Sequence, residues 1–151
     1  MTQFALEEIA AALVSEGKGI LAADETVPTL SKRFAALDIQ STPSSRRDFR
    51  ALLLTTPGAA EALSGVILYD ETLRQQSADG EPIASLCGRL GILPGIKVGL
   101  GAKPMAGTDG ERVTEGLDGL RDRLAEYREL GAKFDVGPVS VPVPSLRPSC
   151  R

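Results

Sequence analysis

Three short apolar runs alternate with helical patterns along this chain of 151 residues. The runs lie at residues 19–23, 65–69 and 95–99. A continuous apolar run of this length is typical of a strand buried on both faces, as in a parallel sheet. Lys133 and Phe134 open a fourth run. Strands that alternate with helices in this way favour a parallel α/β sheet with right-handed crossovers.

The spacing of apolar residues predicts the helices between these runs. We expect helices at residues 3–16, 30–37, 43–54, 81–90 and 114–130, the second capped by Thr29. A (β/α)₈ barrel needs ~250 residues, so the chain has room for about half of one. A complete doubly wound domain would also fit, and length alone leaves both open.

Charge and residue types exclude several classes of function. A net charge of −3 and a pI near 5.1 argue against a nucleic-acid surface, which normally carries a basic excess. The sequence has no His, which excludes a Ser-His-Asp triad and a His-based zinc site. Cys87 and Cys150 form no disulfide pattern and fit a reducing compartment. No apolar run approaches the ~20 residues of a membrane span, so we expect a soluble, cytoplasmic protein.

Asp24 stands directly after the first apolar run. Parallel α/β folds place their active sites at the carboxyl ends of strands. An unpaired buried carboxylate would be costly, so Asp24 should meet a cation or bound hydroxyls there. Two interpretations stay open at this point: a catalytic carboxylate, or a helix-capping role for Asp24 or Glu25.

Two basic positions have equally open interpretations. Lys97 lies inside the third run, where it could point into a barrel interior and bind phosphate, or extend outward from a strand end. Arg33 follows Lys32 on a predicted helix, where it could face a phosphate or belong to a solvated helix surface. Asp70 and Glu71 are interpreted as part of a solvated face.

The segment 17–26, GKGILAADET, resembles the first barrel strand of class I fructose-bisphosphate aldolases, which typically reads GKGILAADES. Further blocks agree in order and spacing with that family: Ser31–Arg33, RRDFRALLLT from Arg46, GVILYDETL from Gly65, Gly95–Val98, PMAGTDGE from Pro104, Gly116–Leu120 and Gly131–Phe134. Several collinear blocks are far more specific than any one of them.

The resemblance implies a (β/α)₈ barrel that reversibly cleaves fructose 1,6-bisphosphate into dihydroxyacetone phosphate and glyceraldehyde 3-phosphate in glycolysis. Class I members use no metal or other cofactor, and a lysine amine forms a Schiff base with the substrate ketone. The family's catalytic aspartate maps onto Asp24, and its substrate-binding lysine maps onto Lys97. Residues that handle phosphate map onto Thr26, Thr29 and Arg33. Members are typically homo-oligomeric.

The resemblance ends sharply after Phe134. The family continues there with Ala-Lys-Trp-Arg, and in register its catalytic lysine falls on Val136. Valine carries no charge and transfers no proton. The Schiff-base lysine of the family belongs to later strands, so no residue of this chain maps onto it. We therefore expect this chain alone to lack turnover.

Residues 136–151 read VGPVSVPVPSLRPSCR, and the prolines exclude a helix and most ladder pairing. We expect residues 1–135 to form the amino-terminal half of the barrel and residues 136–151 to be an unrelated, disordered tail. A frameshift, a premature stop or a mispredicted gene end near codon 135 would explain the change. Two alternatives remain: a non-catalytic half-barrel that associates with another copy, and a compact phosphosugar-binding domain that uses Lys97 and Arg33.

Overall fold

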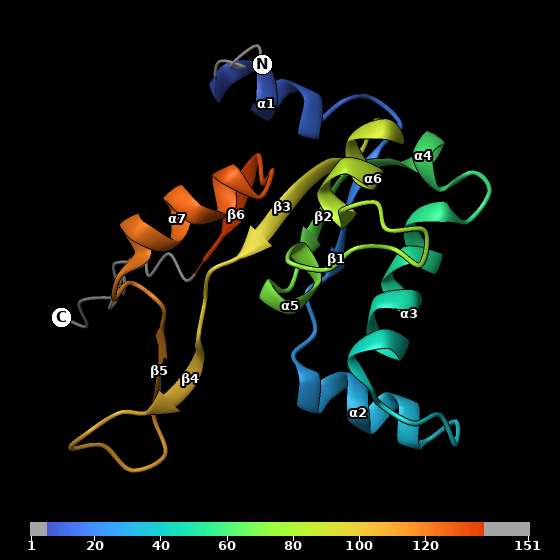
Figure 1. Cartoon of the computed structure of the whole chain (residues 1–151). Coiled ribbons are helices and arrows are strands. Elements are labelled where there is room, and N and C mark those ends of the chain that lie inside the picture. Colours follow the sequence, from blue (N-terminus) through green and yellow to red (C-terminus); the bar gives the residue numbers. More distant parts are fainter. Residues whose placement is uncertain (1–5, 138–151) are drawn as a thin grey trace, which may run out of the picture.

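A four-stranded parallel sheet forms the centre of the molecule, in the order β1-β2-β3-β6 (Figure 1). The structure is a computed structural model and describes residues 6–137. The predicted disordered tail falls almost wholly outside these residues. The strands of the sheet are β1 (Gly19–Ala23), β2 (Leu63–Leu68), β3 (Leu93–Lys97) and β6 (Phe134–Val136). All four predicted strands are present, and the predicted parallel α/β sheet is confirmed.

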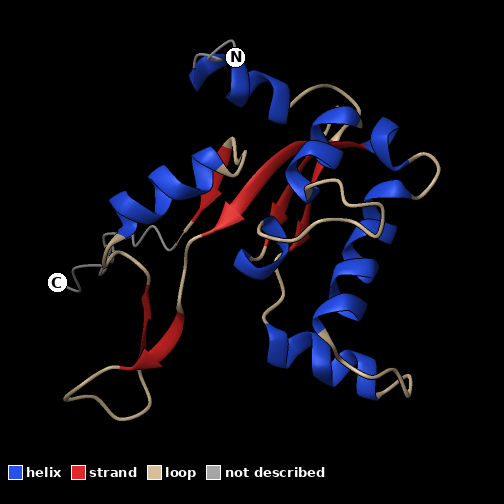
Figure 2. Ribbon diagram, viewed as in Figure 1, coloured by secondary structure: helices blue, strands red, loops and turns tan. Residues whose placement is uncertain are grey.

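Helices lie between the strands, and those that contribute to the buried core pack on one face of the sheet (Figures 1 and 2). Their bounds are α1 Leu6–Leu13, α2 Val27–Ala35, α3 Pro43–Thr55, α4 Ala59–Ala62, α5 Asp70–Leu73, α6 Ile83–Arg89 and α7 Leu120–Glu129. The α3 helix begins where the sequence predicts, because Thr42 and Ser45 form a capping box ahead of it.

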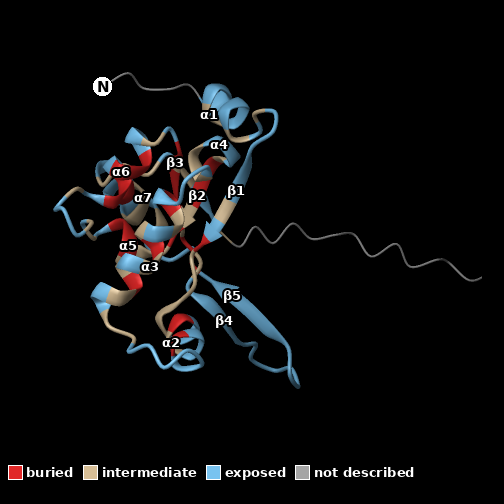
Figure 3. Cartoon of the chain, turned by 90° about the vertical axis from the view of Figure 1, so that its right-hand side faces the viewer, coloured by how far each residue is buried: buried red, intermediate tan, exposed pale blue. Residues whose placement is uncertain are grey.

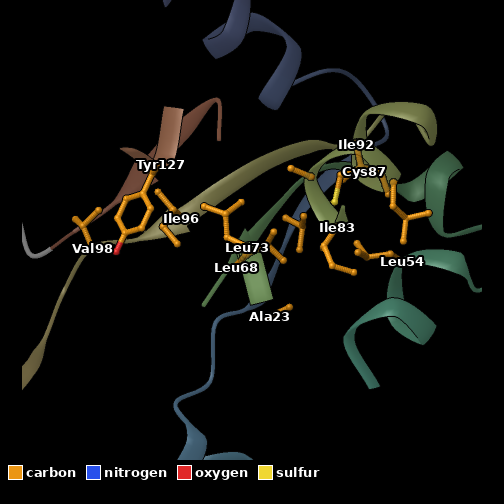
Figure 4. Packing of buried hydrophobic residues seen from close by; sticks show 13 residues of the cluster. Ala23, Leu54, Leu68, Leu73, Ile83, Cys87, Ile92, Ile96, Val98 and Tyr127 are labelled. Atoms are coloured by element: carbon orange, nitrogen blue, oxygen red, sulfur yellow. The ribbon is translucent and has the colours of Figure 1, made fainter. Parts of the chain in front are cut away.

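Alternation along the strands divides the sheet into two faces. On β1, β2 and β3, and at the residue directly after β3, the side chains turned toward the helices belong to the buried core: Ala23, Val66, Leu68, Ile96 and Val98. Figure 4 shows this core running from Leu54 and Ile83 to Ile96 and Tyr127. The residues between them lie on the opposite face, which we call the inner face. Asp24 and Lys97 follow that inner-face register.

Phe134 lies across the inner face where two strands carry glycine. A Cβ built on Gly95 would lie 2.3 Å from Cζ of Phe134, and one built on Gly65 would lie 3.3 Å from Cε1 of the same ring. Since real Cβ atoms essentially never approach that closely, Gly95 is required for the ring to occupy this place. The aromatic ring thus docks β6 against β3 from the inner side.

The helix predicted at residues 114–130 is wrong over its first six residues. Residues 114 and 115 end the second strand of a hairpin formed by β4 (Gly101–Pro104) and β5 (Arg112–Glu115), and residues 116–119 connect this hairpin to the helix. The helix α7 begins only at Leu120 because Gly119 has a φ of +61° and Gly116 a φ of +146°, which end any helical run. All eight hairpin strand residues are exposed, and the hairpin projects away from the sheet (Figure 3).

The start of α2 also differs from the prediction. We expected Thr29 to cap this helix, but the cap position is Thr26 and the helix begins at Val27. Pro28 lies in its first turn, where the missing N–H costs nothing. The proline therefore marks the start more reliably than the later threonine.

Candidate functional site

Asp24 and Lys97 form an ion pair at the carboxyl end of the sheet. Nζ of Lys97 lies 3.1 Å from Oδ2 of Asp24 and donates a hydrogen bond of 2.8 Å to the main-chain oxygen of the same residue. The two side chains are 26% and 27% exposed. The two residues meet because parallel strands end at the same edge, although 73 positions separate them in sequence. The cation that Asp24 required is Lys97.

This geometry argues against one of the two interpretations left open for each residue, while the catalytic role of Asp24 and the phosphate-binding role of Lys97 stay predictions. Asp24 does not cap α2, whose first turn has no side-chain cap. Lys97 points along the inner face toward Asp24 and does not extend outward from the strand end. A carboxylate and an ammonium side by side can together bind a polyhydroxylated anion, because one accepts from hydroxyls and the other donates to phosphate.

Thr26 and Thr29 lie at the start of α2, close in sequence to Asp24, and Arg33 lies in the last turn of the same helix. Oγ1 of Thr26 lies 3.0 Å from Oγ1 of Thr29, so the two hydroxyls form a hydrogen-bonded pair. The guanidinium of Arg33 is 58% exposed and pairs with Oε1 of Glu25 at 2.5 Å. The phosphate roles of these three residues stay predictions, and an incoming phosphate would compete with Glu25 for Arg33.

Arg50 of α3 is a buried cation that sequence analysis missed. Its side chain is 1% exposed. Its Nε donates to the main-chain oxygen of Ala23 at 2.9 Å, and its Nη2 donates to that of Glu25 at 2.6 Å. Desolvation lowers the pKa of Arg50, while the nearby carboxylate of Glu25 opposes that shift. The signal was present: Arg46, Arg50 and Leu54 recur at four-residue spacing, and all three are buried.

Tyr69 is a second residue that sequence analysis did not single out. It follows β2, and its ring lies under two cations: Nζ of Lys97 is 5.8 Å and Cζ of Arg50 is 6.0 Å from the ring centroid. Cation–π contacts at these distances favour keeping both side chains in place. The ring connects the ion pair on the inner face with the buried guanidinium.

The sequence predicts that Asp70 and Glu71 form part of a solvated face, but in the structure both carboxylates form ion pairs. Glu71 accepts two hydrogen bonds from Arg46, whose side chain is 7% exposed. The guanidinium holds the pKa of Glu71 below its usual range. Asp70 pairs with Arg74, which also reaches Glu126 of α7. Both carboxylates therefore join α5 to neighbouring helices.

Arg123 holds the chain where it leaves β3. Its Nη1 donates to the main-chain oxygen of Val98 at 3.1 Å, and its Nη2 donates to that of Gly116 at 2.5 Å. One guanidinium thereby ties the residue after Lys97 to the return of the hairpin.

A pocket of about 380 Å³ lies at the opposite end of the sheet, between α1 and the starts of β2 and β3. Its lining includes Ile9, Ala12, Lys18, Ser64 and Leu93. It is therefore separate from the ion pair. Within residues 6–137, no three His, Cys, Asp or Glu side chains gather closely enough to hold a metal. No helix in the same range is both long and apolar enough to cross a membrane.

Comparison with known proteins gives a consistent result. Residues 5–144 match the family described as fructose-bisphosphate aldolase class-I. The chain is 55% identical over 129 residues to a probable fructose-bisphosphate aldolase class 1 of Xanthomonas campestris pv. campestris, an alignment that covers 85% of this chain and 39% of that protein. It is 52% identical over 135 residues to the cytosolic fructose-bisphosphate aldolase 6 of Arabidopsis thaliana, covering 88% and 38%.

A solved structure agrees with these relatives. The fructose-bisphosphate aldolase of Plasmodium falciparum, crystallised with TRAP and a small-molecule inhibitor, superposes with a TM-score of 0.81 at 44% identity. The match covers 84% of this chain and 37% of that one. The chain thus spans about two fifths of the length of the relatives that it matches.

Proposed function

Because this chain belongs to the class I fructose-bisphosphate aldolase family, we propose that its Asp24–Lys97 pair forms part of a binding site for a phosphorylated sugar. In the whole protein this site would serve the reversible cleavage of fructose 1,6-bisphosphate. The contact between the Asp24 carboxylate and the Lys97 ammonium, at 3.1 Å, is the observation that carries the proposal. The cytosolic names of several relatives favour a cytoplasmic location.

Each residue has a role that follows from its chemistry. The Lys97 ammonium donates hydrogen bonds to phosphate or to a sugar oxygen. The Asp24 carboxylate accepts from sugar hydroxyls and can take up the proton that the C4 hydroxyl loses as the C3–C4 bond breaks. Thr26, Thr29 and Arg33 offer two hydroxyls and a guanidinium for a phosphate near the start of α2.

The covalent step needs an amine from elsewhere. In the family, a lysine amine adds to the ketone carbon, water leaves, and the resulting iminium accepts the electron pair of the cleaved C–C bond. No described residue corresponds to that lysine, and the position beside Lys97 is Val136. We therefore propose that these 151 residues alone bind a phosphosugar without forming a Schiff base.

Calorimetry with dihydroxyacetone phosphate tests the binding. We expect the unmutated chain to release heat on binding and Lys97→Met to weaken the affinity by roughly tenfold, the factor for one hydrogen bond to a charged group. Lys133→Met is the matched control, because this exposed lysine directly precedes β6, at the end of that strand opposite to the end that pairs with Lys97. Equal affinities in the two variants would contradict the site.

Borohydride reduction tests the covalent step separately. With dihydroxyacetone phosphate present, we expect the intact mass of the chain to stay unchanged. An added reduced triose phosphate on any lysine would show that a Schiff base forms here after all.

Association with a second copy is a further candidate function. Among the described strands, β1 and β6 each pair on one side only. Ile20 on β1 is 45% exposed and Val136 on β6 is 41% exposed. Unpaired strand edges with apolar side chains favour pairing with another chain. Sedimentation velocity at rising protein concentration should show growth of a dimer, and a constant monomer would contradict this candidate.

A further inference from the structure

Arg50 reaches the main chain on both sides of Asp24. Its Nε donates to the oxygen of Ala23 and its Nη2 to the oxygen of Glu25, the residues directly before and after Asp24. The guanidinium is a rigid planar fork, so two bonds at fixed angles define the path of the intervening residue. No other described side chain donates a hydrogen bond to both of these oxygens.

The burial of the Arg50 side chain carries a desolvation cost. The side chain is 1% exposed, and placing a cation there is costly unless its donors are satisfied. Nη1 of Arg50 has no partner, and Glu25 Oε2 is 3.8 Å from Nη2. An apolar residue would fill the same space more cheaply. The two main-chain bonds are what an apolar residue cannot supply.

The bonds of Lys97 depend on the same stretch of chain. Nζ of Lys97 contacts the main-chain oxygen and the carboxylate of Asp24. Both acceptor atoms belong to the residue that Arg50 brackets. A shift of this stretch would therefore move both partners of the ammonium at once.

We propose that Arg50 is a positioning residue, whose guanidinium fixes the main chain around Asp24 and thereby keeps the Asp24–Lys97 pair formed. Arg50 lies on the helix side, and it acts on the inner face through the backbone. The effect of Arg50 on the binding of a phosphosugar rests on the proposed function. The effect of Arg50 on the contact between Lys97 and Asp24 is independent of that function.

The reactivity of Lys97 toward acetic anhydride tests the proposal, read by mass spectrometry against Lys32 and Lys133 in the same sample. Arg50→Met should raise the acetylation rate of Lys97 by roughly 2- to 10-fold, the factor for losing one hydrogen bond. Asp24→Asn provides the reference for a broken pair. Arg50→Lys should give an intermediate rise, because one ammonium cannot reproduce the two-pronged fork.

Arg46→Met is the matched control. Arg46 lies one turn earlier on α3 and is also buried, but it pairs with Glu71. It should lower stability and leave the Lys97 rate unchanged. A folded Arg50→Met chain with the unmutated Lys97 rate would overturn the proposal, and so would a rise of equal size in Arg46→Met.

A second measurement covers the case in which Arg50→Met does not fold. In the unmutated chain, the Nε–H of Arg50 should exchange with solvent at least about tenfold more slowly than that of exposed Arg33. Equal exchange rates would overturn the proposal. Phosphosugar binding by the unmutated chain is measured separately, so a chain that binds none but shows the Lys97 response refutes the proposed function and leaves the role of Arg50 standing.

Discussion

Val136 is the register partner of Lys97 across β3 and β6. Its main-chain oxygen accepts a hydrogen bond of 3.0 Å from the main-chain N–H of Val98, the residue that follows Lys97. Both side chains follow the inner-face register. The position to which the family resemblance assigns a catalytic lysine is therefore adjacent to the ion pair. Because valine is uncharged, Lys97 is the cationic side chain of these two register partners.

Val136→Lys should strengthen phosphosugar binding. A second ammonium beside Lys97 adds a donor for phosphate, which we expect to raise the affinity up to about tenfold at low salt. Repulsion between the ammonium groups should lower the free energy of unfolding by no more than about 1 kcal/mol, since the position is partly exposed. Val136→Met controls for side-chain length, and equal calorimetric affinities of the two variants would refute the expectation.

Glu71→Gln should remove part of the acid sensitivity of the fold. Arg46 keeps the pKa of Glu71 below its unfolded value, so the stabilisation is present above pH ~4.3 and is lost as pH falls through the folded pKa. At pH 7 we expect the variant to unfold with about 1–2 kcal/mol less free energy. Urea titrations from pH 7 downward should show this gap narrowing once the pH falls below ~4.3, and a gap that widens as the pH falls, or no gap at pH 7, would contradict the pairing.

Gly95→Ala should destabilise the chain by about 1–3 kcal/mol, because the new methyl would overlap the ring of Phe134. Gly88→Ala is the control, since nothing lies within 4 Å of its Cβ and it sits in α6. That variant should gain about 0.5–1 kcal/mol from helix propensity. Thermal melts should therefore show a lower Tm for Gly95→Ala and a slightly higher Tm for Gly88→Ala than for the unmutated chain. Rescue of Gly95→Ala by Phe134→Leu would identify the ring as the cause.

Arg123→Met should loosen the connection between β3 and the hairpin. The oxygens of Val98 and Gly116 would lose their shared donor, so we expect protease cleavage between residues 99 and 119 to accelerate several-fold. Arg121→Met changes an exposed residue on the same helix and should cleave at the unmutated rate. Equal cleavage of both variants would show that the guanidinium does not hold the loop.

The strands could be predicted because each apolar run is short and bounded by glycine or charge. Asp24 and Lys97 stood out because charge at the end of, or inside, such a run is unusual. The hairpin at residues 101–115 could not be predicted, since its strands are exposed and carry no apolar alternation. The roles of Arg50 and Arg123 could not be predicted, because both donate to main-chain oxygens, which every residue type has.

The sequence separation of the paired strands bears on the order in which the molecule folds. Each of its ladders joins residues about 30 to 45 positions apart, as in the pairing of Gly19 with Leu63. The β4–β5 hairpin joins residues close in sequence and would form within about microseconds. The sheet forms more slowly, because each of its strand pairings closes a long loop at a cost in conformational entropy. A nascent chain of this topology would therefore expose β1 for as long as β2 has not left the ribosome. Synthesis rate, and not the stability of the finished sheet, would set how long that strand is open to aggregation.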